Sequence, residues 1–146
     1  MSTTLEFVET TLIQLGFAYS DAIGPGGDRW LVVLLGVRGG ELTLYISVGF
    51  GGTYLSVHSV IGNTDLARTA DADRLARSLL ETAYRMRITR VGVDSMTGDI
   101  VLAADVYLMD AALTAGMLKR LIDCMVMSSR EPMALLATVA TNASND

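Results

Sequence analysis

The sequence predicts an α+β fold in which helices flank a single antiparallel sheet of five strands. Two observations lead to this class. Apolar residues recur every three or four positions in the first, middle and last parts of the chain, which indicates helices. The segments between them alternate with period two or form short apolar runs bounded by glycine, which indicates strands. The expected order is helix, three strands, helix, two strands, and one or two further helices.

The first helix is expected over residues Ser2 to Phe17. Thr3 and Glu6 stand three positions apart and match a capping box, in which each side chain bonds a backbone N–H group of the other. Gly16 is placed to end the helix, because glycine adopts the left-handed conformation of a helix cap without strain. Four apolar residues at spacings of three and four predict one buried stripe: Leu5, Val8, Leu12 and Leu15.

The next segment predicts three strands joined as an antiparallel meander. Residues Asp21 to Asp28 are glycine-rich and are expected to form a loop. Trp30 to Leu35 is apolar throughout, which predicts a strand covered on both faces. Glu41 to Val48 and Thr53 to Ile61 alternate between apolar and polar residues, which predicts half-buried strands. The glycines of Gly49-Phe-Gly-Gly52 lead into a strand and not into a helix, so they predict a hairpin turn and not a phosphate-binding loop.

The second half of the chain predicts a helix, two strands and a helical C-terminal region. The helix is expected over Asp71 to Met86, and the strands over Ile88 to Val93 and Asp99 to Leu108. A further helix is expected from Thr114 to about Ser129. Pro132 then interrupts the pattern and is expected to open a fourth helix over Pro132 to Val139, because proline is tolerated in the first turn of a helix.

The composition indicates one globular domain. A chain of 146 residues with 51% hydrophobic and 18% charged residues is expected to form a single domain over residues 1–140, followed by a polar tail over 141–146. The net charge is −5 and the basic residues are scattered, which disfavours nucleic acid as a partner. Cys124 and His58 are the only residues of their kinds, so neither a disulfide nor a Cys/His zinc site is expected, and no metal or cofactor is predicted.

The N-terminal residues predict no signal peptide, because they lack a basic segment followed by an apolar one. The longest purely apolar run, Trp30 to Leu35, is far shorter than the roughly 20 residues that cross a bilayer. The expected location is the cytoplasm, with no membrane partner.

His58 is the first candidate for chemistry. On the alternating strands it shares one face with other polar and aromatic side chains: Tyr45, Ser47, Tyr54 and Ser56. A catalytic imidazole needs an orienting carboxylate and a nucleophile, and no acidic residue lies between Glu41 and Asp65. The face is therefore interpreted as a surface, with a small-molecule or nucleotide-sensing face as the alternative. A hydrolase that uses His58 with Ser56 or Ser59 is a third hypothesis.

The helix that begins at Thr114 is the unusual element, because its apolar residues cover roughly 220° of its circumference where a helix on a sheet needs about 100°. Another helix, a second subunit or a client protein is needed to cover the remainder. Five of the eight methionines lie between residues 109 and 133, and methionine suits adaptable binding surfaces. The predicted partner-binding residues are Met117, Leu121, Met125 and Met127.

The order of elements and one C-terminal pattern resemble a known family. The pattern runs from Arg87-Ile-Thr-Arg-Val-Gly-Val-Asp94 through Gly98-Asp-Ile-Val-Leu-Ala-Ala-Asp-Val-Tyr-Leu108 to a helix start at Leu113-Thr114. It is similar to the YbjN-like proteins, bacterial proteins often labelled sensory transduction regulators, which share a fold with the type III secretion chaperones. The resemblance covers nearly the whole chain and brings no catalytic residues with it.

The resemblance implies a non-enzymatic protein that acts through its surfaces as a homodimer. In the chaperone relatives the second helix and the strand after it take part in dimerisation, and the residues in the matching elements here are Leu79, Tyr84, Val91 and Val93. The sequence and the resemblance together predict a protein-binding module, chaperone-like or regulatory.

Overall fold

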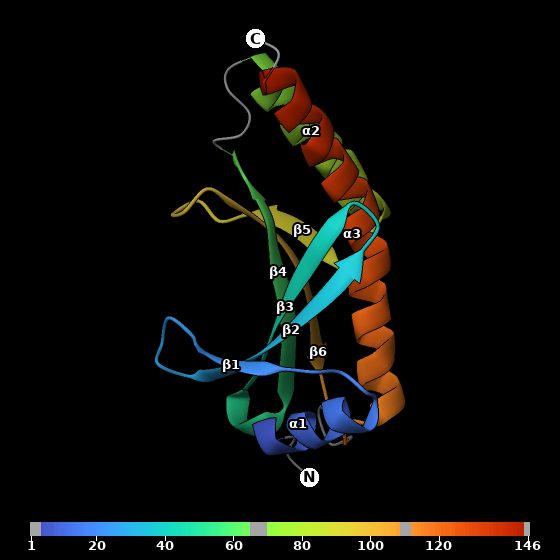
Figure 1. Ribbon diagram of the computed structural model, residues 1–146. Coiled ribbons are helices and arrows are strands. Elements are labelled where there is room, and N and C mark those ends of the chain that lie inside the picture. Colours follow the sequence, from blue (N-terminus) through green and yellow to red (C-terminus); the bar gives the residue numbers. More distant parts are fainter. Residues whose placement is uncertain (1–3, 65–69, 109–111, 145–146) are drawn as a thin grey trace.

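The computed structural model describes residues 4–64, 70–108 and 112–144. It confirms the α+β class, with three α-helices and one antiparallel sheet over these residues (Figure 1). In chain order the elements are α1 (Leu5–Gln14), β1 (Ser20–Ile23), β2 (Arg29–Val37), β3 (Gly40–Gly49), the short 3-10 helix η1 (Phe50–Gly52), β4 (Tyr54–Asn63), α2 (Ala70–Arg85), β5 (Arg90–Val93), β6 (Asp99–Tyr107) and α3 (Ala115–Ser144).

The sheet has six strands in the order β1-β2-β3-β4-β6-β5, and not the five that the sequence predicts. The additional strand is β1, which lies partly in the segment expected to be a loop. Ala22 pairs with Trp30, and the turn between them is closed by a bond from the Gly24 N–H to the Asp28 carbonyl at 2.7 Å. A four-residue edge strand with the sequence Ser-Asp-Ala-Ile is too short to show a strand pattern, so only its pairing with β2 reveals it.

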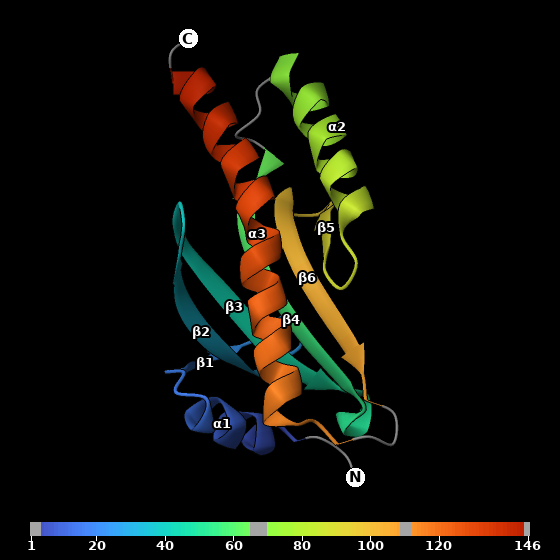
Figure 2. The same cartoon turned by 90° about the vertical axis from the view of Figure 1, so that its right-hand side faces the viewer.

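The helices lie on one side of the sheet and leave the opposite face open (Figures 1 and 2). In these views α3 crosses the middle of the sheet, α1 lies at one end beside the first turns of α3, and α2 lies beside the C-terminal half of α3. The main core lies between the sheet and the N-terminal half of α3. A second cluster lies under α2, with the residues Leu75, Leu79, Ile100, Leu136 and Val139.

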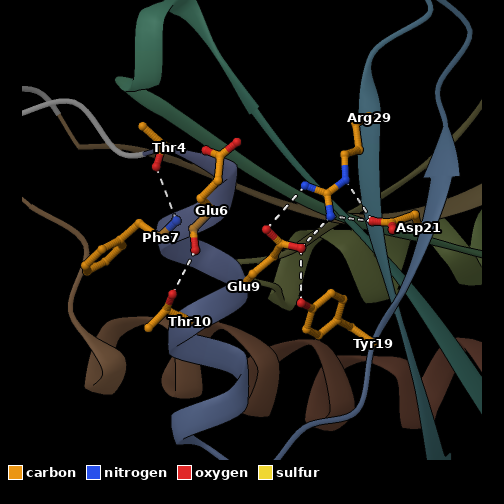
Figure 3. Close-up of polar contacts among 8 residues, drawn as sticks. All are labelled: Thr4, Glu6, Phe7, Glu9, Thr10, Tyr19, Asp21 and Arg29. Carbon is orange, nitrogen blue, oxygen red and sulfur yellow. Dashed lines mark hydrogen bonds and ion pairs between the residues drawn. The ribbon is translucent and has the colours of Figure 1, made fainter.

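α1 begins and ends close to where the sequence predicts. The cap is Thr4, whose hydroxyl accepts a hydrogen bond from the Phe7 N–H at 3.2 Å; the expected cap, Thr3, lies outside the described residues (Figure 3). Gly16 follows the helix at φ +82°, and its N–H donates to the Ile13 carbonyl, which confirms its role in ending the helix. The stripe is confirmed as well, because Val8 is fully buried and its neighbours in the stripe are buried or half-buried.

A cluster of polar groups joins α1 to the β1–β2 hairpin (Figure 3). The Arg29 guanidinium donates to both carboxylate oxygens of Glu9 and, at 2.8 Å from Nε, to Asp21. The Tyr19 hydroxyl donates to Glu9 at 3.0 Å. The hydrogen bond from Arg29 lowers the pKa of Glu9, and the same carboxylate raises the pKa of Tyr19. Two elements that are separate in the sequence are thereby joined at the surface.

β2 is covered on only one face, which corrects the prediction of a strand buried on both. Leu31 and Val33 are buried beneath the helices, whereas Leu34 on the open face is 60% exposed. An apolar run shows which segment is a strand, but the number of layers around it is decided by elements elsewhere in the chain. β3 and β4 follow their predicted alternation, and Gly49-Phe-Gly-Gly52 forms the turn between them as predicted.

α3 runs without a break from Ala115 to Ser144, so the prediction of two helices separated at Pro132 is wrong. Proline lacks the N–H that would bond the carbonyl four residues earlier, and such a position kinks a helix or breaks it. Here the helix bends along its length and continues (Figure 1), and Pro132 is buried, as are Ser129 and Leu136 on either side of it. The helix also includes residues 141–144, which the sequence assigns to a polar tail.

Candidate functional site

An apolar hollow of about 230 Å³ lies between α2 and the edge strand β5, and we call it the α2–β5 hollow. Its lining is Ala76, Leu79, Leu80, Ala83, Val91, Gly92 and Val93. Leu79 is buried at its base, whereas Leu80 is 71% exposed. The apolar stripe of α2 is therefore wider than the surface that the sheet and α3 cover.

Three of the four residues predicted for a dimer interface line this hollow, namely Leu79, Val91 and Val93. The fourth, Tyr84, lies on α2 outside the hollow and is 87% exposed. In the part of the chain that the structure describes, β5 is the last strand of the sheet and pairs with β6 on one side only. An unpaired edge next to an apolar helix face is a surface on which another chain can dock.

A second surface runs beside α3, and we call it the α3 groove; one part of it is apolar, and the other mixes apolar side chains with polar ones, among them the ion-paired Arg85 and Glu131. Two adjoining hollows form it, of about 200 and 300 Å³, and they share Ile88 and Cys124. The first is lined by Leu55, Ile88, Val106, Leu113, Met117, Arg120, Leu121 and Cys124. In Figure 2 the C-terminal part of β6 lies beside α3 with no helix over it, which is where this groove opens.

The predicted partner-binding residues separate into two groups. Met117 lines the α3 groove and Met127 lines its second hollow, with exposed fractions of 37% and 66%. Leu121 lies at the base of the groove and is almost completely buried. Met125 is fully buried in the main core, so in this conformation it does not reach a partner. Part of the wide apolar face that the sequence predicts is therefore covered by the protein's own sheet.

The open face of the sheet carries the polar residues that the sequence singles out. The strand register places Tyr45, His58, Ala103 and Arg90 side by side on β3, β4, β6 and β5. Tyr45 stacks on His58 with ring centroids 5.3 Å apart, and the indole of Trp30 is nearly perpendicular to the His58 ring, with centroids 5.0 Å apart. An open hollow of about 720 Å³, the open-face hollow, lies over these residues.

Asp105 connects polar groups at the side of this face. It accepts a hydrogen bond from the Ser56 hydroxyl at 2.8 Å and forms an ion pair with Arg90. Burial raises the pKa of Asp105, but the hydrogen bonds from Ser56, Arg90 and Tyr54 outweigh burial, and its pKa lies below the ordinary value. Burial lowers the pKa of His58, with partial opposition from the charge of Asp105. The imidazole is therefore predominantly neutral at pH 7.

The same contacts disfavour a hydrolase at His58. Ser56 is hydrogen-bonded to Asp105, and Ser59 is fully buried on the opposite, helix-covered face of β4. Within the described ranges, therefore, neither serine pairs with the imidazole as a nucleophile pairs with its base.

The layout belongs to the α+β architecture of the type III secretion chaperones, and three solved structures are similar to it. The crystal structure of YbjN from E. coli matches with a TM-score of 0.60 at 12% identity, covering 97% of this chain and 93% of that one. A chain of the heterodimeric ExoU–SpcU complex from the type III secretion system of Pseudomonas aeruginosa matches with a TM-score of 0.56 at 19% identity, covering 88% and 96%. A chain of the HopA1–SchA chaperone–effector complex matches with a TM-score of 0.52 at 11% identity, covering 84% and 88%.

Similarity at this level of identity shows the fold, and the fold implied by the family resemblance is confirmed. No family model and no curated protein matches the chain. Although α3 is 30 residues long, no helix in the part of the chain that the structure describes is apolar over a long enough stretch to cross a membrane.

Proposed function

We propose that the protein is a non-enzymatic protein-binding module, chaperone-like or regulatory, which self-associates through the α2–β5 hollow and binds a protein client in the α3 groove. The observation that carries this proposal is that exposed apolar side chains line both surfaces, with Leu80 and Val93 at the first and Ile88, Met117 and Met127 at the second. Apolar surface of this kind is stabilised by removal from water. Two of the similar structures are complexes with a second protein, which agrees with the proposal.

The α2–β5 hollow suits a second copy of the chain. Its lining is apolar on both sides, and β5 offers an unpaired strand edge next to it. Two copies related by a two-fold axis bring the same surface of each into contact, so one hollow covers the other. Leu80 and Val93, which are exposed in the single chain, become buried in such a dimer.

Self-association is tested by light scattering of the wild-type protein and two matched variants. Leu80→Asp places a charge in the hollow and is expected to change the mass from that of a dimer to that of a monomer. Ile13→Asp is the control, because Ile13 is 64% exposed on α1, far from the hollow, and is expected to leave the mass unchanged. A monomeric wild-type protein, or an equal response of the two variants, would contradict the dimer.

Client binding is tested by affinity capture from the native organism, with mass spectrometry as the readout. Met117→Asp is expected to abolish recovery of a client, because it charges the α3 groove. The fold tolerates the change, since Met117 lies in the first turn after the Thr114 cap, where a negative charge is favoured by the helix dipole. Met96→Asp is the control, because Met96 is exposed in the β5–β6 turn outside both surfaces. Equal recovery with both variants would contradict a client in the groove.

A further inference from the structure

The open-face hollow lies on the side of the sheet away from α3, so it is separate from the surfaces of the proposed function. Two hairpin turns border it, one between β1 and β2 and one between β5 and β6. Figure 1 shows both turns projecting to the same side, away from the helices. Ile23 and Pro25 from the first turn, and Asp94 and Thr97 from the second, line the hollow. Its walls therefore come from the two ends of the sheet.

The floor of the hollow is aromatic. Trp30, Tyr45 and His58 come from three neighbouring strands, and each ring contacts the other two at centroid distances of 5.0 to 5.9 Å. Trp30 is fixed from the side by the β1–β2 turn, because a Cβ atom on Gly24 would overlap its indole. Ala103 lies between His58 and Arg90 in the register, and its short side chain leaves the floor low at that point. The rings are thus held in place and remain partly exposed.

The charge around the hollow is negative. Among the described residues that line it, Arg90 alone is basic, and its charge is offset by the ion pair with Asp105. Asp94 and Asp99 line the hollow as well. The Asp94 carboxylate accepts a hydrogen bond from the Met96 N–H, and the Asp99 carboxylate accepts one from the Asn63 amide. A carboxylate has about four lone pairs that can accept. Burial lowers the pKa of His58, so its imidazole is predominantly neutral at pH 7. A cation above this floor meets aromatic faces and the carboxylates of Asp94 and Asp99, while the charge of Arg90 is paired with Asp105.

The shape of the hollow indicates the size of its occupant. Small-molecule sites are concave pockets that enclose most of the ligand surface. This hollow is wide and open to solvent, with a volume of about 720 Å³. An extended peptide lies along such a surface over several residues, at a rise of about 3.3 Å per residue, and needs no enclosure. The occupant that fits best is a chain segment and not a free small cation.

We propose that the open-face hollow binds an extended basic peptide segment, with an arginine or lysine side chain over the Trp30–Tyr45–His58 floor and its charge facing Asp94 and Asp99. The interaction combines a cation–aromatic contact with charge attraction, so it weakens as ionic strength rises. This site is independent of the α3 groove, and it assigns a role to the polar face that the sequence singles out.

The chain contains a single tryptophan, and it lies on the floor of the hollow, so its fluorescence reports on this site. The probe is a peptide of about eight alternating arginine and serine residues, long enough to cross the hollow. Titration of the wild-type protein at low salt is expected to give a saturable change in Trp30 emission. A matched peptide of glutamate and serine is expected to give none.

Two double variants separate the site from the overall charge of the protein. Asp94→Asn with Asp99→Asn removes two charges from the hollow while keeping an acceptor oxygen at each position, and a loss of affinity of roughly tenfold or more is expected. Glu41→Gln with Glu81→Gln removes two exposed charges outside the hollow, and an unchanged affinity is expected. Trp30→Leu, measured by anisotropy of a labelled peptide, is expected to weaken binding by roughly threefold to thirtyfold.

Three results would overturn the proposal. One is the absence of a saturable fluorescence change with the arginine peptide. Another is an equal loss of affinity in the two double variants, which would mean attraction by net charge alone. The third is binding of arginine amide as tight as that of the peptide, which would mark a site for a small cation. The Leu80→Asp and Met117→Asp variants are expected to bind the peptide normally, so failure here and failure of the proposed function are distinguishable.

Discussion

α1 and α2 lie against opposite ends of α3, and they are covered to different degrees. On α1, Val8 and Leu12 are fully buried in the main core. On α2, Leu75 and Leu79 are buried in the smaller second cluster, but Leu80 beside them is exposed. The apolar stripe of the first helix is covered within the chain, although Phe7 and Ile13 outside the stripe are exposed, whereas the second helix leaves Leu80 uncovered next to its buried residues.

The polar contacts of α1 with the rest of the chain are also more extensive than those that join α2 to α3. α1 is joined to the β1–β2 hairpin by the cluster of Glu9, Tyr19, Asp21 and Arg29. Among the described residues, an exposed ion pair between Arg85 and Glu131 joins α2 to α3. α1 is therefore held to the rest of the monomer by both apolar and polar contacts, whereas one side of α2 stays exposed, as the proposed dimer requires.

The largest expected difference between the two helices is in core packing. Leu12→Ala removes buried groups from α1 and is expected to lower the free energy of unfolding by about 2–5 kcal/mol, as for other buried leucines. Leu80→Ala is expected to change the stability of the monomer by no more than about 0.5 kcal/mol, because the side chain is mostly exposed. Urea unfolding of both variants, at protein concentrations where the chain is monomeric, measures the difference. Similar losses in the two would show that α2 is covered within the monomer.

A smaller effect is expected from the polar cluster on α1 when the pH is changed. The hydrogen bond from Arg29 to the Glu9 carboxylate lowers the pKa of Glu9 below the ordinary value of 4.5. A carboxyl group with a lowered pKa in the folded state stabilises the fold above its unfolded pKa, and this contribution is lost as the pH falls through the folded pKa. Glu9→Gln is therefore expected to be less stable than the wild type at neutral pH, with the difference shrinking below about pH 4.5. A difference that stays constant from neutral to acid pH would contradict this role of Glu9.

The sequence predicts most of the fold because local patterns carry it. β3 and β4 alternate strictly, and α1 and α2 show apolar residues at helical spacing. β1 escapes prediction because a four-residue polar edge strand is specified by its pairing with Trp30 and its neighbours, and not by its own residues. The continuity of α3 through Pro132 escapes prediction for a similar reason, since burial of the proline among other elements outweighs its local preference.

The candidate surfaces are less predictable, because they are made by elements far apart in the chain. Alternation places Tyr45 and His58 on one face, as the sequence predicts. Trp30, Arg90 and Asp105 join that face only through the strand register, which no local pattern reveals. On α3 the sequence predicts a wide apolar face but not which part the sheet covers, so it groups the buried Met125 with the exposed Met127.

α3 takes part in two different cores, and this has a consequence for how the molecule opens. The N-terminal half packs in the main core with the sheet, whereas Leu136 and Val139 pack with α2 in the second cluster. Proteins open in cooperative units that follow such clusters. We expect hydrogen exchange to divide α3 in two, with amides after Pro132 exchanging together with those of α2 and ahead of those in its first half. A dimer closed over α2 would slow that exchange, so the protection of α2 amides becomes a direct measure of self-association.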